Sequence, residues 1–126
     1  MKPATTCALA ALTCCLMVGQ ANAADECWRV GGRYHLTSPG PWDMTSATDA
    51  GRECRGAFHS FGNVIFEKLY LVAPPKSGKV RLQSGGYFYY QPNAGYRGDD
   101  VFRLRVCGTE GGFKGCTDIN MRILVR

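Results

Sequence analysis

The segment from Gly86 to Val106 constrains the fold of this chain more than any other feature of the sequence. It contains two strand-like stretches, separated by a corner rich in Pro, Asn, Gly and Asp. A side-chain period of two places Phe88 and Tyr90 on one face of a first strand. In the second stretch, the residues that share one face are Phe102, Leu104 and Val106. Two half-buried strands joined by such a corner are typical of a small all-β sandwich.

The corner between these strands contains the residue types that reverse the direction of a chain. Pro92 fixes φ, while Gly95 and Gly98 can adopt positive φ at no steric cost. The carboxylate of Asp100 can accept hydrogen bonds from nearby backbone N–H groups. The sequence therefore predicts a well-defined turn at this point of the chain.

Residues 1–23 have the pattern of a Sec-type signal peptide. Lys2 gives a positive start, the stretch 8–18 is apolar, and small residues precede a predicted cleavage point after residue 23. The apolar stretch is too short to span a membrane. The residues before Cys14 and Cys15 fit a lipidation signal poorly. The sequence therefore predicts export to the periplasm or the extracellular medium, with no transmembrane segment in the mature chain.

Residues 24–126 are enough for a single domain with one hydrophobic core. The whole chain has a formal net charge of +5, and one positive side chain, Lys2, leaves with the leader. This balance is too weak to indicate a nucleic-acid partner, and export also argues against one. We therefore expect one exported domain with no role in binding nucleic acid.

Four cysteines remain in the mature chain, and an even number in a short exported protein predicts two disulfides. Cys107 and Cys116 bracket a glycine-rich stretch between two strand-like runs, so a hairpin would bring their Cα atoms within bridging range. Cys27 and Cys54 are then left to link the amino-terminal segment. Zinc is the competing interpretation, but no Cys-x-x-Cys occurs and neither histidine has finger-like spacing.

Short strand-like runs separated by Gly- and Pro-rich turns fill the mature chain, and helical patterns are nearly absent. The predicted strands are Trp28–Thr37, Val64–Val72, Lys79–Gln83, Tyr87–Gln91, Val101–Val106 and Ile119–Val125. The stretch from Pro41 to Arg55 is polar and rich in small residues, so we expect a long loop there, held by Cys54. This spacing predicts a sandwich or a barrel.

Three spaced motifs are similar to those of a known family. They are Pro-x-x-Gly-x-Val from Pro75, Gly-x-Phe-x-Tyr-x-Pro from Gly86, and Gly-Tyr-x-Gly-x-Asp-x-Phe from Gly95. In this spacing the chain resembles bacterial Ig-like and cadherin-like domains, over residues 64–125. The resemblance implies an Ig-like Greek-key β-sandwich that is extracytoplasmic and non-catalytic. The chain departs from the family in its single copy and its disulfides, which suit a small free-standing protein.

The residues of the last motif have a structural interpretation. Tyr96 is placed for a tyrosine corner, with its ring in the core and its hydroxyl on nearby backbone, and Phe102 is a core residue. Asp100 is expected to cap N–H groups of the same turn. A calcium site at Asp99 and Asp100 is the alternative, but calcium takes about six to eight oxygen ligands and no Asp-x-Asp loop accompanies the pair. We therefore predict no metal and no cofactor.

Signals for catalysis are weak in this sequence. His35 falls on a polar face with Arg33 and Thr37, as a surface histidine does. Neither Gly-x-Ser-x-Gly nor His-Glu-x-x-His occurs, and paired cysteines offer no free thiol nucleophile. The sequence therefore predicts a protein that is not an enzyme.

Four arginines are predicted to share one outer face of the sandwich. If the apolar residues of the last two strands point inward, then Arg103 and Arg105 point outward, as do Arg122 and Arg126. We call these four residues the arginine face. The planar guanidinium group suits carboxylates and phosphates, so acidic polysaccharide, envelope lipid phosphate and acidic protein patches are candidate ligands. A solvated strand face that discourages edge-to-edge pairing is the alternative interpretation.

The function predicted from the sequence is that of a secreted or periplasmic, non-catalytic Ig-like module for binding or structure. Two alternatives stay open. One is a protein that binds carbohydrate or envelope polyanions through the arginine face. The other is an exported inhibitor or accessory subunit of an enzyme, which would use the loop 38–55 or the hairpin tip 108–115.

Overall fold

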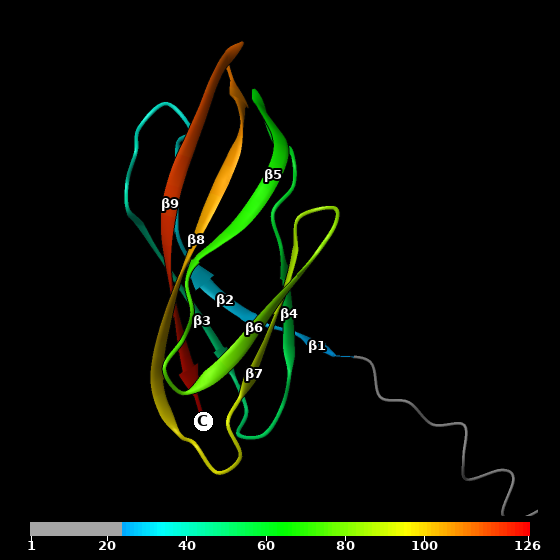
Figure 1. Ribbon diagram of the computed structural model, residues 1–126, viewed down its shortest axis with the longest axis vertical. Helices are drawn as coiled ribbons and strands as arrows, with labels where there is room; N and C mark the ends of the chain where they lie inside the picture. The colour runs from blue at the N-terminus through cyan, green and yellow to red at the C-terminus, as the bar shows by residue number, and fades with distance from the viewer. Residues whose placement is uncertain (1–23) are drawn as a thin grey trace, which may run out of the picture.

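Two β-sheets face each other in the computed structural model, which describes residues 24–126 (Figure 1). The predicted signal peptide, residues 1–23, lies outside the described residues. One sheet has four strands in the order β1-β4-β7-β6, and the other has five in the order β2-β3-β9-β8-β5. The strands are β1 Asp25–Glu26, β2 Trp28–Gly31, β3 Trp42–Thr48, β4 Cys54–Ala57, β5 Val64–Ala73, β6 Gly78–Gln83, β7 Tyr87–Pro92, β8 Gly98–Glu110 and β9 Phe113–Val125. The predicted all-β sandwich with two disulfides is confirmed.

The core lies between the two sheets and follows from the alternation along the strands. In β7, β8 and β9 the fully buried apolar side chains are Phe88, Tyr90, Phe102, Leu104, Val106, Ile119, Met121, Ile123 and Val125. Each large apolar side chain that is buried contributes about 1.5–3 kcal/mol to stability. The ring of Tyr90 stacks on Phe102 at a centroid distance of 5.8 Å, and Phe88 meets Phe102 edge-on at 5.8 Å. These contacts join β7 of one sheet to β8 of the other.

The β8–β9 hairpin is longer than the sequence predicted. Its pairing runs from Gly98 opposite Val125 to Glu110 opposite Phe113. Gly111 and Gly112 form the two-residue turn, and both have positive φ, as a tight hairpin turn of this type requires. Gly108 and Gly115 belong to the strands, where the sequence suggested only a hairpin tip. Glycine is needed at both positions because neighbouring backbone leaves no room for a Cβ atom.

The loop expected from Pro41 to Arg55 is wrong, because the chain forms β3 and β4 there. β3 pairs with β9 in parallel, from Trp42 opposite Ile119 to Thr48 opposite Val125. The small residues that resembled a loop are buried under their neighbours, since Ser46, Ala47 and Thr48 are each less than a tenth exposed. Small, polar side chains can occupy a strand when sheet neighbours cover them.

The predicted strand Trp28–Thr37 is also shorter in the structure, where β2 ends at Gly31. The following residues leave the sheet and lie across the β8–β9 hairpin. Tyr34 and Leu36 still contribute to the core, with exposed fractions of 8% and 1%. Alternation of buried and exposed residues thus continued past the end of the strand, which explains why the pattern predicted a longer one.

Candidate functional site

The predicted corner is organised around the buried carboxylate of Asp100, which is only 5% exposed. It accepts hydrogen bonds from the backbone N–H groups of Lys76, Ser77 and Val101, each at 3.1 Å. It also accepts one from the hydroxyl of Tyr90 at 2.7 Å. Burial, and then the Asp100 carboxylate, raise the pKa of Tyr90, so the hydroxyl stays protonated as a donor.

Asp100 therefore does more than cap its own turn, as the sequence had suggested. Of its three backbone donors, Lys76 and Ser77 belong to the connection between β5 and β6, and only Val101 is local. The carboxylate joins two connections that are far apart in sequence. This arrangement satisfies a buried charge internally and makes Asp100 a structural residue.

The other corner residues also have structural positions. Gly95 and Gly98 have positive φ, at 79° and 123°, and Pro92 is buried at the end of β7. The hydroxyl of Tyr96 donates to the carbonyl oxygen of Asp99, and its ring is half-buried against the core. Phe102 is 1% exposed. Together these residues shape the β7–β8 connection.

Both disulfides have the pairing that the sequence predicted. Cys107 and Cys116 lie directly opposite each other in β8 and β9, with their Cα atoms 4.1 Å apart. Cys27 and Cys54 have Cα atoms 4.8 Å apart and join the segment between β1 and β2 to β4. One disulfide thus lies on the five-stranded sheet, and the other holds β1 beside β4 at the edge of the four-stranded sheet.

The arginine face lies on the outer surface of the five-stranded sheet, and much of its charge is engaged within that surface. Arg105 makes a two-point contact with Asp118, with N–O distances of 2.7 and 3.2 Å. This contact lowers the pKa of Asp118 and raises the pKa of Arg105. Arg103 donates to the amide oxygen of Asn120 at 2.9 Å, and that amide donates to Asp43 at 3.3 Å.

The remaining two residues of the arginine face differ from each other. Arg126 lies 3.9 Å from Asp49, and its guanidinium carbon is 6.0 Å from the centre of the Trp28 ring. Arg122 lies opposite Val101 and is exposed, and none of the ion pairs found in residues 24–126 involves it. The face therefore presents less uncompensated charge than four arginines suggest.

A second basic surface, which sequence reasoning missed, lies on the outside of the four-stranded sheet. Cross-strand pairing places Tyr89 of β7 between Arg55 of β4 and Arg81 of β6. The guanidinium carbon of Arg81 lies 3.7 Å from the centre of the Tyr89 ring, and that of Arg55 lies 5.5 Å from the Tyr87 ring. We call Arg55, Arg81, Tyr87 and Tyr89 the tyrosine–arginine face. Arg81, Tyr87 and Tyr89 occupy alternate positions of the predicted strands Lys79–Gln83 and Tyr87–Gln91. The register between these two strands was not predicted from the sequence.

A hollow of about 390 Å³ adjoins this face where β1 meets β4. Its polar lining includes the carboxylate of Glu26, the guanidinium of Arg55 and the imidazole of His59, while Tyr87 supplies an aromatic wall. Cys27, which is bonded to Cys54, belongs to the same lining. Hydrogen-bond donors and acceptors and an aromatic surface therefore converge in one concave place.

His35 is exposed, as the sequence predicted, but it has a specific partner. Its Nδ1 atom donates to Glu110 at 2.8 Å, and the other oxygen of Glu110 accepts from the N–H of Leu36 at 2.7 Å. The hydrogen bond from His35, then that from Leu36, lower the pKa of Glu110. These contacts hold the segment after β2 on the β8–β9 hairpin. His35 and His59 also line a second hollow of about 380 Å³, with Tyr34 and Phe61.

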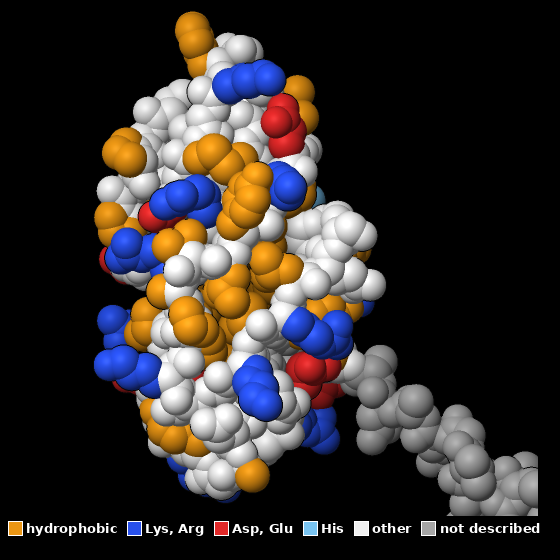
Figure 2. All heavy atoms as spheres, viewed as in Figure 1, with side chains coloured by type: hydrophobic (Ala, Val, Ile, Leu, Met, Phe, Trp, Pro, Cys, Tyr) orange, Lys and Arg blue, Asp and Glu red, His pale blue; other side chains and the backbone are white. Residues whose placement is uncertain are grey.

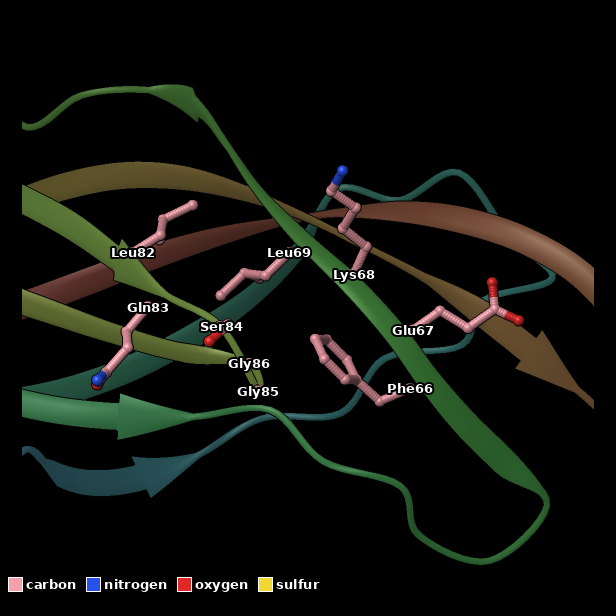
Figure 3. A pocket seen from close by; sticks show the side chains of 9 residues that line it. All are labelled: Phe66, Glu67, Lys68, Leu69, Leu82, Gln83, Ser84, Gly85 and Gly86. Atoms are coloured by element: carbon pink, nitrogen blue, oxygen red, sulfur yellow. The ribbon is translucent and has the colours of Figure 1, made fainter.

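A third hollow lies between the edge strands β5 and β6, on the side where the sandwich is open. Figure 3 shows Phe66 and Leu69 of β5 reaching toward the β6–β7 turn, with Leu82 of β6 on the other side. In Figure 2, which has the same viewpoint as Figure 1, hydrophobic side chains gather along the middle of the molecule in this region. The hollow has a volume of about 310 Å³, and its lining combines these apolar side chains with the polar residues Glu67, Lys68, Gln83 and Ser84.

No protein-family model matches this chain, and no curated protein matches it either. Among residues 24–126, no group of three or more His, Cys, Asp and Glu side chains is placed to hold a metal ion. The same part of the chain contains no helix long and apolar enough to cross a membrane. Function must therefore be argued from the surfaces and hollows described above.

Proposed function

We propose that this protein is an exported, non-catalytic Ig-like binding module that recognises an anionic partner through an outer sheet face. The observation that carries this proposal is that both outer faces display arginines. On the four-stranded sheet Arg55 and Arg81 flank Tyr89 in one cross-strand row, and on the five-stranded sheet the arginine face spans β8 and β9. Arginine and aromatic residues are the side chains that contribute most to binding surfaces. The two disulfides support an oxidising compartment, as the predicted signal peptide does.

The strand order supports the Ig-like part of the proposal. β4, β7 and β6 are neighbours in one sheet, while β5, β8 and β9 are neighbours in the other. In constant-type Ig domains, strands B, E and D are likewise neighbours in one sheet, and strands C, F and G are neighbours in the other. The β3 strand adds to β9 in parallel at the opposite edge. The resemblance to bacterial Ig-like and cadherin-like domains, stated from three sequence motifs, agrees with this order.

Binding of polyanions is tested by retention of the exported protein on heparin and on acidic polysaccharide at low and high salt. Exposed ionic contacts are weak one at a time, so we expect multivalent binding that is lost as salt increases. Exchanging Arg103, Arg105 and Arg122 for Ser measures how much of the retention depends on the arginine face. A wild-type protein that passes through every anionic column at low salt would contradict the proposal.

The alternative of an exported inhibitor or accessory subunit has one favourable observation. Phe113, at the tip of the β8–β9 hairpin, is 72% exposed and so is available for a protein partner. Half of the other segment considered, 38–55, belongs to strands, since it contains β3 and the first residues of β4. Co-purification from a periplasmic extract with wild type and with Phe113→Ser tests this function directly.

A further inference from the structure

We propose that the tyrosine–arginine face and the hollow beside it bind a carboxylate-bearing polysaccharide, with one acidic sugar ring in the hollow. This inference rests on the proposed function and names the site and the ligand class for it. The site consists of Arg55, Arg81, Tyr87 and Tyr89 on the flat outer surface, and Glu26 in the hollow. It is distinct from the arginine face, which belongs to the other sheet.

Tyrosine rings hold the guanidinium groups of this face in place before a ligand arrives. Arg81 stacks on Tyr89 at 3.7 Å, and the hydroxyl of Tyr89 is itself held by a hydrogen bond to Gln83 of 2.7 Å. A stacked guanidinium keeps its N–H groups in one plane, where they match the two oxygens of a carboxylate. Less side-chain entropy is then lost when the ligand binds.

The carboxylates that contact these arginines are held only weakly. Arg81 lies 3.3 Å from Glu53, and Arg55 lies 3.8 Å from Glu26. The side chains of Arg81 and Arg55 are 60% and 41% exposed. Exposed pairs of this kind contribute little to stability, so exchanging a protein carboxylate for a ligand carboxylate costs little. The arginines of this face are therefore available to a ligand.

The lining of the hollow favours a sugar over a simple anion. Glu26 lines the hollow, and its carboxylate repels any anionic group placed against it but accepts hydrogen bonds from hydroxyl groups, which a sugar ring offers and a simple anion does not. Arg55 and His59 supply donors, and the exposed ring of Tyr87 supplies an apolar wall for the carbon face of a sugar. A polyhydroxylated ring with a carboxylate uses all of these groups.

The disulfide Cys27–Cys54 has a part in building this site. Parallel pairing places Glu26 of β1 opposite Arg55 of β4, and the disulfide follows directly after β1. β1 has only two residues and no other neighbour in its sheet. Without the covalent link, the Glu26 side of the hollow would depend on very few backbone hydrogen bonds.

The test uses the exported, oxidised protein and polygalacturonate, a polymer of carboxylate-bearing sugars, in a titration at low salt. Exchanging Arg55 and Arg81 for Lys keeps the charge but removes the stacked planar forks. We expect this double variant to bind the polymer about tenfold more weakly. The matched control exchanges Arg103 and Arg105 for Lys on the other sheet and is expected to bind like wild type. Melting temperatures of both variants establish that they are folded.

Two further arms separate the sources of negative charge. Polyglutamate presents carboxylates without sugar, and vesicles that contain anionic phospholipid present phosphate. Polygalacturonate is expected to bind more tightly than either, and Tyr87→Ala is expected to weaken polygalacturonate binding but not polyglutamate binding.

Several outcomes would overturn the inference. One is a Lys double variant that binds polygalacturonate like wild type, which would show that charge alone matters. Equal or tighter binding of polyglutamate or of vesicles would remove the argument for a sugar. Loss of binding in the control variant alone would move the site to the arginine face and leave the proposed function standing, whereas a wild type that binds no anion would contradict both.

Discussion

The two outer faces of this sandwich carry arginine in different settings. On the five-stranded sheet, Arg105 is neutralised by Asp118 on the neighbouring strand, and Arg103 is held by an amide that itself contacts a carboxylate. On the four-stranded sheet, Arg81 is stacked on a tyrosine and makes a single contact with the carboxylate of Glu53, at 3.3 Å. Both faces are basic by composition, but the second brings a closely stacked guanidinium, two tyrosine rings and an adjoining hollow together.

This difference shows that the number of arginines on a face does not by itself indicate whether the face can bind an anionic ligand. A guanidinium paired with a carboxylate in the next strand has its fork occupied, and the pair stabilises the sheet surface modestly at best. A guanidinium that lies on an aromatic ring has its plane fixed but its edge still accessible. Cross-strand register therefore decides which face can recognise a ligand.

The largest loss of stability is expected when a disulfide is removed. Each disulfide belongs to one sheet, so removing them one at a time compares the two sheets. Removing the Cys27–Cys54 link by exchange of both residues for Ala should cost about 3.5 kcal/mol, and removing Cys107–Cys116 about 2.5 kcal/mol. The order follows from the sequence separations, which are 27 and 9 residues. Urea denaturation of the two double variants measures both costs.

The same two variants also separate the faces functionally. Loss of Cys27–Cys54 should weaken polygalacturonate binding, since Glu26 lies directly beside this link, whereas loss of Cys107–Cys116 should leave binding unchanged. The comparison between the faces would break if the second variant lost binding and the first retained it.

A smaller but still large effect is expected at Asp100, which links the two sheets. Asp100→Ala should cost about 3 kcal/mol, because it leaves buried donors from Tyr90, Lys76 and Ser77 without their acceptor. The neighbouring change Asp99→Ala should cost less than about 0.5 kcal/mol, since that side chain is exposed. Chemical denaturation measures both. Equal effects of the two changes would show that the buried carboxylate is not the anchor described here.

Tyr96 is expected to contribute less than Asp100. The sequence predicts that the ring of Tyr96 lies in the core, in which case Tyr96→Ala would cost more stability than Asp100→Ala. The structure shows a half-buried ring, so Tyr96→Ala should cost about 1–2 kcal/mol. A cost greater than that of Asp100→Ala, measured in the same denaturation series, would restore the original order.

The smallest expected effect concerns the pH dependence of the arginine face. Contact with Arg105 lowers the pKa of Asp118 in the folded protein below its ordinary value of 3.8. The stability from this pair is therefore present above that ordinary value and is lost as the pH falls through the lower, folded pKa. Melting curves between pH 5 and pH 2 should show a shallower acid-side decrease for Arg105→Gln than for wild type, by a small margin because Arg105 is about half exposed to solvent.

Local patterns in the sequence determined the class of this fold and its covalent links. Alternation in residues 86–106 predicted two strands with buried Phe88, Tyr90, Phe102, Leu104 and Val106, and all five are buried. The disulfide pairing was also predicted, because cysteines on two strands of one hairpin come within bridging range. The strands and the Cys107–Cys116 link depend on residues close together in the chain, where spacing carries the information, and Cys27–Cys54 followed because these two cysteines were the pair that remained.

Only the tertiary structure decided which distant residues meet. Trp42–Thr48 became a strand because β9, more than seventy residues further on, offers a parallel partner that covers its small side chains. Asp118 reduces the charge of the arginine face, and the tyrosine–arginine face exists because three strands place Arg55, Tyr89 and Arg81 in one row. Alternation shows which side of a strand a residue occupies, but the register between strands is set by packing of the whole sandwich.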